Sequence, residues 1–226
     1  MKLSIIIPAY NEEISLEKSI PLILKAFPRA ELIVVNDGSF DRTKDILSQF
    51  NIKIINNEKN LGKGLSLKRG ILAAEGELVI FTDADLPFRI EGIKKVAEAL
   101  EETGANIAIA EKLEYRKNAS YLLARAIVKF FIRVFLSIHF KDTQAGLKGF
   151  TKNTAKEIFQ ITKINRFASD IEILFLAKQK NFKVISLPLQ VASDNLRPSS
   201  FNLKEGFLFL LDIIRIKIAK YDEKNY

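Results

Sequence analysis

The sequence predicts an α/β fold with a mostly parallel sheet flanked by helices, and two observations indicate it. Short, continuous apolar runs recur along the first half of the chain, and stretches with helical patterning separate them. Runs of this kind are typical of strands buried on both faces, and helices of ten or more residues are the usual connection between parallel strands. We therefore expect successive βαβ units.

The elements can be assigned in order. The expected strands are LSIII (residues 3–7), ELIVV (31–35), IKIIN (52–56), LVIF (78–81) and NIAIA (106–110). Helices are expected to begin near Glu12, Asp41, Lys63 and Arg89. Because aspartate accepts hydrogen bonds from the free N–H groups of a first turn, Asp41 is expected to be the N-cap of the helix RTKDIL.

The second half contains two apolar segments that also carry basic residues. Residues 122–140 are interrupted by Arg125, Lys129 and Arg133, and each such residue costs about 2.5–3.5 kcal/mol at the centre of a membrane span. We therefore expect an amphipathic helix at a membrane surface here and at residues 203–220, or else a core or dimer helix. Between them the sequence predicts a helix (169–180) and a strand (182–189).

Composition narrows the class of protein. The 226 residues suit a single domain, and the absence of cysteine excludes disulfides and thiolate metal sites. With one histidine, any metal has to be bound by oxygen ligands. The net charge of +8 indicates an anionic partner. Nucleic acid is a poor candidate, because the basic residues lie on apolar helices without interleaved aromatic residues that bases could stack on. The N-terminal apolar run is too short for a signal peptide.

Two aspartates follow the fourth expected strand. Asp83 and Asp85 end the buried run LVIF, where a carboxylate is costly unless it is paired or bound. Separated by one residue, both would point the same way in an extended chain, and two such oxygens suit Mg²⁺ or Mn²⁺ together with substrate phosphates. The alternative is an acidic turn exposed to water.

Other polar motifs follow the neighbouring strands, at the edge where ligands bind in such sheets. Asp37, at the end of the second strand, can accept hydrogen bonds from a base or ribose, or can simply belong to a tight turn. Lys63 stands between Gly62 and Gly64 just before a helix, so backbone N–H groups and an ammonium can approach phosphate. The alternative there is a glycine-rich turn.

The order of these motifs resembles a known family. PAYNEE, VVNDGSFDRT, NLGKGLSLKRG and FTDADL in succession are similar to family-2 glycosyltransferases of the GT-A fold. DTQAGLKGF (142–150) and RFASDIEILFLA (166–177) resemble the polyprenyl-phosphate sugar synthases, which include dolichyl-phosphate glucosyltransferase and dolichol-phosphate mannose synthase. The chain departs from that family at Lys112, Ala145 and Phe167, where arginine, cysteine and tryptophan are usual.

The resemblance implies roles for particular residues. The nucleotide-sugar site would consist of Pro8, Tyr10, Glu12, Asp37, Lys63, Arg69 and Asp83. Mg²⁺ or Mn²⁺ would be held by Asp83, Asp85 and Gln144, while Gln144, Asp170 and Glu172 would border the sugar and the acceptor. Asp85, Arg125 and Asp170 are the expected catalytic residues.

The expected acceptor is a polyprenyl phosphate. A phosphate monoester has a second pKa of about 6, so it needs no general base at neutral pH but does need cations, for which Arg116, Arg125, Lys129 and Arg197 are candidates. We expect an inverting transfer of a hexose from UDP-glucose or GDP-mannose on the cytoplasmic face of a membrane, with a donor half (residues 1–110) and an acceptor half (111–226). The alternatives are a saccharide acceptor with Asp170 or Glu172 as general base, and a non-catalytic nucleotide-sugar-binding subunit.

Overall fold

The computed structural model describes residues 2–113, 126, 128–140, 142–143, 145–192 and 203–221. The core of this part of the chain is a seven-stranded sheet in the order β3-β2-β1-β4-β6-β5-β7. The strands are β1 (Leu3–Ala9), β2 (Glu31–Asn36), β3 (Lys53–Asn56), β4 (Leu78–Thr82), β5 (Ile107–Lys112), β6 (Leu147–Thr151) and β7 (Val184–Leu189). All neighbours pair in parallel except β6, which confirms the expected mostly parallel sheet.

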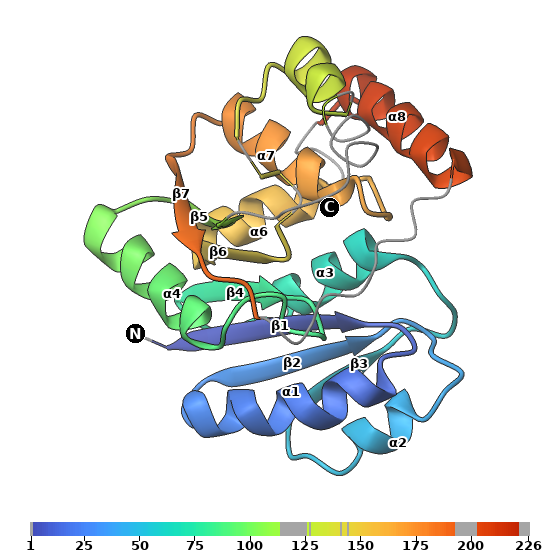
Figure 1. Ribbon diagram of the computed structural model, residues 1–226, viewed down its shortest axis with the longest axis vertical. Coiled ribbons are helices and arrows are strands. Elements are labelled where there is room, and N and C mark those ends of the chain that lie inside the picture. The colour runs from blue at the N-terminus through green and yellow to red at the C-terminus, as the bar shows by residue number, and fades with distance from the viewer. Residues whose placement is uncertain are drawn as a thin grey trace.

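Helices cover both faces of the sheet (Figure 1). On one face lie α1 (Glu13–Ala26), α2 (Thr43–Leu47) and α4 (Glu91–Thr103). On the other lie α3 (Lys63–Leu72), α6 (Lys152–Ile161), α7 (Ser169–Gln179), α8 (Leu203–Ile218) and a π-helical turn, η1 (Ile132–Leu136). Within β1, Ile5 and Ile7 pack on the α1 face and Ile6 on the α3 face, so the strand is buried on both sides, as its apolar run predicts.

Strand β6 and helix α6 lie where the apolar pattern predicts neither. β6 begins in the segment DTQAGLKGF, ends one residue after it, and runs antiparallel between β4 and β5. Gly149 permits this insertion, because a Cβ there would lie 2.4 Å from Val96 Cγ1. The insertion also places Lys148 opposite Phe81, where the lysine side chain is fully buried.

The cap expected at Asp41 is wrong in detail. Helix α2 begins at Thr43 with Arg42 as its N-cap, so Asp41 lies one residue outside it. The Asp41 carboxylate nevertheless accepts hydrogen bonds from the backbone N–H of Thr43 (3.0 Å) and of Glu13 (3.3 Å), at the starts of two helices. Asp41 therefore joins the loops that follow β1 and β2.

Each apolar-basic segment has one buried face and one exposed face. In η1 and α8 the buried apolar residues are Ile132, Leu136, Ile213 and Ile216. Around them the exposed large apolar residues are Phe130, Val134, Phe135, Ile214 and Ile218. The alternative that these segments are core helices is therefore correct for one side of each of them. Within the described ranges, none of the helices combines the length and apolar character that a membrane span requires.

Candidate active site

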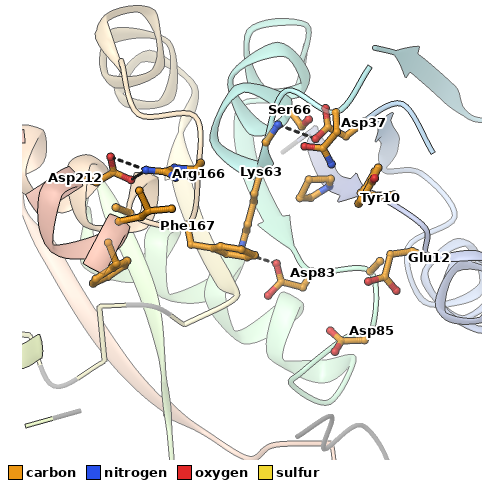
Figure 2. A pocket seen from close by; sticks show the side chains of 18 residues that line it. Tyr10, Glu12, Asp37, Lys63, Ser66, Asp83, Asp85, Arg166, Phe167 and Asp212 are labelled. Carbon is orange, nitrogen blue, oxygen red and sulfur yellow. Dashed lines mark hydrogen bonds and ion pairs between the residues drawn. The ribbon is translucent and has the colours of Figure 1, made fainter. Parts of the chain in front are cut away.

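A cavity of about 600 Å³ opens at the carboxyl edge of β1, β2 and β4 (Figure 2). Loops after these strands line it together with the start of α3, the segment before α7, and α8. Its charged lining residues are Glu12, Asp37, Lys63, Asp83, Asp85, Arg166 and Asp212. Except for Asp212, which belongs to α8, the acidic residues follow three different strands, so the parallel sheet itself brings them to one place.

Asp83 and Asp85 both line the cavity, but through a turn and not through an extended strand end. β4 ends at Thr82, the Leu86 N–H donates to the Asp83 carbonyl (3.1 Å), and Leu86 has a φ of 47°. The Asp83 N–H in turn donates to the Gly146 carbonyl (3.1 Å), next to β6. Both residues line the same cavity, as expected, although the expected backbone geometry is wrong.

Lys63 lies between two carboxylates. Its Nζ is 2.7 Å from Asp83 Oδ1 and 3.5 Å from Asp170 Oδ2. Burial opposes the ammonium charge, but the nearby Asp170 and Asp83 carboxylates outweigh it and raise the pKa of Lys63. Lys63 is therefore protonated throughout the neutral range, and its charge lies beside the site expected for the metal.

Asp170 pairs with a second, fully buried lysine. Lys148 Nζ lies 2.5 Å from Asp170 Oδ1 and donates to the Ala145 carbonyl (2.6 Å). Burial favours the neutral acid, yet the charges of Lys148 and Lys63 lower the pKa of Asp170. The residues Lys148, Asp170, Lys63 and Asp83 thus form a line of alternating charges from β6 to the cavity.

Asp37 holds the loop before α3. Its Oδ1 accepts from Asn57 Nδ2 (2.6 Å) and the Leu61 N–H (2.9 Å), and its Oδ2 accepts from the Gly62 N–H (2.8 Å). Gly62 has a φ of 96°, a backbone conformation that favours glycine, and its N–H lies against the Asp37 carboxylate. Asp37 lines the cavity at the same time, so it connects the cavity wall to the loop that carries Lys63.

The residues expected from the first strand lie at the cavity. Pro8, Tyr10 and Glu12 all line it. The ring of Tyr10 packs edge-to-face against Phe40, with centroids 6.0 Å apart, and both rings are exposed. Tyr10 therefore contributes an exposed aromatic ring to the cavity wall, supported by Phe40.

Several predicted residues do not reach the cavity. Arg69 does not line it, and its guanidinium donates to the Asn57 side chain and to the Asn56 carbonyl. Asp170 lies behind Lys63, and Lys129 is exposed on the helical turn before η1. Arg69, Asp170 and Lys129 are therefore not at the cavity positions that the sequence analysis expects. Gln144, Arg116, Arg125 and Arg197 lie outside the described residues.

Glu172 has a structural environment instead of a place beside the sugar. Its oxygens accept from the backbone N–H groups of Lys163 (2.8 Å) and Ile164 (3.0 Å) and from the Tyr221 hydroxyl (2.9 Å). Burial raises the pKa of Glu172 although these donors oppose the shift. The side chain is fully buried and does not line the cavity, so the expected contact with sugar or acceptor is not met.

The structure also brings to the cavity residues for which the sequence analysis names no role. These are Asn60, Ser66, Arg166, Leu208, Phe209 and Asp212. Asp212 is the one acid inside the apolar run FLFLLDIIRIKI, and that isolation was the available signal. Its partner, Arg166, is 46 positions away in the chain, so no local pattern could have paired them.

The donor set fits a hard divalent cation that also binds substrate. Among the described residues, no group of three or more histidine, cysteine, aspartate or glutamate side chains converges. Mg²⁺ in enzymes that act on phosphates is commonly held by one or two carboxylates and completed by phosphate oxygens and water. The two carboxylates of Asp83 and Asp85 match that arrangement, and the lack of soft ligands excludes a thiolate site.

Comparison with known proteins gives consistent matches. The model of the family Glycosyl transferase family 2 matches residues 4–158. A dolichyl-phosphate beta-glucosyltransferase of Trichomonas vaginalis is 30% identical over 96% of this chain and 73% of its own length. Another of that name from Dictyostelium discoideum is 27% identical over 95% of this chain and 77% of its own.

The fold matches a solved glycosyltransferase structure. The crystal structure of glucosyl-3-phosphoglycerate synthase from Mycobacterium tuberculosis, in complex with Mn²⁺, UDP and glucosyl-3-phosphoglycerate, superposes with a TM-score of 0.74. The match covers 95% of this chain and 78% of that chain at 20% identity, and it confirms the GT-A fold. From the strand-end acids, the sheet order and these matches together, we conclude that the chain belongs to glycosyl transferase family 2 and is a glycosyltransferase.

Proposed function

We propose that the enzyme transfers a hexose from a uridine nucleotide sugar to a polyprenyl phosphate, with a divalent cation and with inversion at the anomeric carbon. The names of the Trichomonas and Dictyostelium relatives state a dolichyl-phosphate acceptor and a glucosyl group. The Mycobacterium structure contains Mn²⁺ and UDP. These properties belong to those proteins and support the proposal for this chain.

The observation that carries the acceptor assignment is the state of Asp170 and Glu172, the two carboxylates that the saccharide alternative requires as general base. Asp170 is paired with two lysines, which lower its pKa, and Glu172 is enclosed by three hydrogen-bond donors. Neither lines the cavity. A sugar hydroxyl needs a base, whereas a phosphate monoester is already anionic at neutral pH. The site therefore favours a phosphate acceptor over the saccharide alternative.

The state of Asp37 favours uracil over guanine. A carboxylate offers about four acceptor positions, and loop donors occupy three of them in Asp37, two on Oδ1 and one on Oδ2. The remaining capacity matches the single N3–H of uracil. Guanine presents N1–H and N2–H side by side and would require both oxygens to be available.

The chemistry follows from these positions. Asp83 and Asp85 would hold Mg²⁺ or Mn²⁺, which neutralises negative charge on the diphosphate leaving group. Lys63 adds a fixed positive charge beside Asp83. An oxygen of the acceptor phosphate attacks the anomeric carbon, the bond from that carbon to the diphosphate oxygen breaks, and UDP leaves with the electron pair.

The exposed apolar faces support a peripheral membrane location for the acceptor. Phe130, Val134 and Phe135 are exposed beside the basic Lys129 and Arg133, and on α8 the exposed Ile214 and Ile218 flank Lys217. Apolar side chains with adjacent cations fit the interface of an anionic bilayer. In a flotation assay, the protein should rise with phosphatidylserine vesicles and less so with neutral ones; equal absence from both would refute this location.

The reaction is tested with radiolabelled UDP-glucose and GDP-mannose, each offered separately with a short polyprenyl phosphate and Mn²⁺. We expect lipid-linked product from UDP-glucose only, none with the polyprenol that lacks phosphate, and none from Asp85→Ala. Product from GDP-mannose would overturn the reading of Asp37. Transfer to a saccharide hydroxyl in place of the lipid phosphate would overturn the acceptor assignment.

A further inference from the structure

Arg166 and Asp212 form an ion pair in the wall of the cavity. Arg166 Nη2 donates to Asp212 Oδ1 (3.2 Å) and Oδ2 (3.1 Å), and both residues line the cavity. Asp212 is 3% exposed and belongs to α8, whereas Arg166 lies in the segment before α7. Figure 2 shows the pair on the α8 side of the cavity, with Phe167 between it and Asp83.

The pair leaves part of the guanidinium available. Asp212 engages Nη2, and the hydrogen bonds found in the described part of the chain do not use Nε or Nη1 of Arg166. The side chain of Arg166 is 42% exposed, so these donors can be reached by a ligand. Each bidentate fork of a guanidinium includes Nη2, which Asp212 occupies, so a phosphate oxygen accepts one charge-assisted hydrogen bond from Nη1 and lies beside the delocalised positive charge.

The backbone at Arg166 is tied to the donor side of the site. The Asn165 carbonyl accepts from the Gly64 N–H (2.7 Å), directly beside Lys63. A Cβ on Gly64 would lie 2.2 Å from the Ile164 carbonyl oxygen, so the two segments are in close contact. Glu172 accepts from the Lys163 and Ile164 N–H groups on the other side. These backbone contacts hold Arg166 at a fixed position relative to Lys63 and Asp83.

Apolar side chains surround the pair. Phe167 follows Arg166 and is 65% exposed, and Leu208 and Phe209 come from the same helix as Asp212. All three line the cavity. A cation next to aromatic and aliphatic side chains matches a phosphate attached to an apolar chain better than one attached to a polar polyol.

We propose that Arg166 binds the phosphate of the acceptor, that Asp212 is the positioning residue that orients the guanidinium, and that Phe167, Leu208 and Phe209 receive the first prenyl groups. This proposal rests on the proposed function and places the acceptor phosphate at Arg166. It also gives α8 two roles, because one face of the helix lines the cavity and the other is exposed.

The test compares Arg166→Gln, Arg166→Lys and Asp212→Asn with the matched control Arg215→Gln. Arg215 also donates to Asp212 (3.0 Å) but does not line the cavity. With geranyl phosphate as soluble acceptor, Arg166→Gln should raise the acceptor KM about 10- to 100-fold, as expected for the loss of a charged hydrogen-bond donor. The KM for UDP-glucose should stay unchanged. Arg166→Lys should recover part of the loss, Asp212→Asn should show a smaller rise in the same constant, and Arg215→Gln should show none.

A binding measurement separates this inference from the proposed function. Calorimetry with geranyl phosphate, geraniol and glycerol 3-phosphate is performed on protein saturated with UDP and Mn²⁺. Binding of geranyl phosphate that Arg166→Gln abolishes supports the inference even if no transfer is seen, in which case only the proposed function fails. Equal affinity in wild type and Arg166→Gln overturns the phosphate site, and glycerol 3-phosphate binding as tightly as geranyl phosphate overturns the prenyl contacts.

Discussion

Gly146 should control the position of the Asp83 carboxylate. A Cβ at Gly146 would lie 2.0 Å from Asp83 Oδ2 and 2.8 Å from its Cγ. Ordinary contact begins near 3.4 Å, so in Gly146→Ala the oxygen has to move by roughly 1.4 Å or β6 has to shift. Because misplacement of a reacting group by about 1 Å can cost 100-fold in rate, we expect kcat/KM to fall about 100-fold and the Mn²⁺ requirement to rise.

The assay is sugar transfer from UDP-glucose across a Mn²⁺ titration, with the melting temperature measured in parallel. Gly92→Ala is the control: this glycine lies in α4, and its nearest neighbour to a new Cβ is Leu147 Cδ2 at 3.3 Å. It should keep wild-type activity. If Gly146→Ala retained wild-type activity and Mn²⁺ dependence, Asp83 would not be held against β6 as described, and its role at the cation site would lose its support.

Three further changes test other parts of the site. Asp170→Asn should destabilise the fold by about 3–5 kcal/mol because it leaves the buried Lys148 charge unpaired, and the double change Lys148→Met/Asp170→Leu should recover most of that in urea unfolding. Because folding raises the pKa of Glu172, the contribution of this group to stability is complete below about pH 4.5 and falls as pH rises through the folded-state pKa. Glu172→Gln should remove this pH dependence of the free energy of unfolding. It should also lower that free energy by about 1–3 kcal/mol, because one amide oxygen cannot accept from both the Lys163 and the Ile164 N–H groups in place of two carboxylate oxygens. Asp37→Asn should raise the UDP-glucose KM about tenfold or more and leave the acceptor KM unchanged, because the single amide oxygen of asparagine cannot accept from both the Leu61 and the Gly62 N–H groups. An unchanged KM for UDP-glucose would contradict the assignment of Asp37.

The features that the sequence determined are those with a local physical cause. Continuous apolar runs such as residues 78–81 indicate strands buried on two faces, and the carboxyl ends of parallel strands meet at one edge. The juxtaposition of Asp37, Asp83 and Lys63 follows from that rule alone, before any contact is known. The motif order was enough to indicate the family.

The features that only the tertiary structure decided depend on contacts between distant residues. The insertion of β6 between β4 and β5 is one, because it buries Lys148 opposite Phe81 and thereby pairs it with Asp170, 22 positions away. The pairing of Arg166 with Asp212 is another, and it brings α8 to the cavity. A buried charge is tolerated only where a partner reaches it, and which partner does so depends on how the helices and strands pack. Local patterns in the chain do not contain that information.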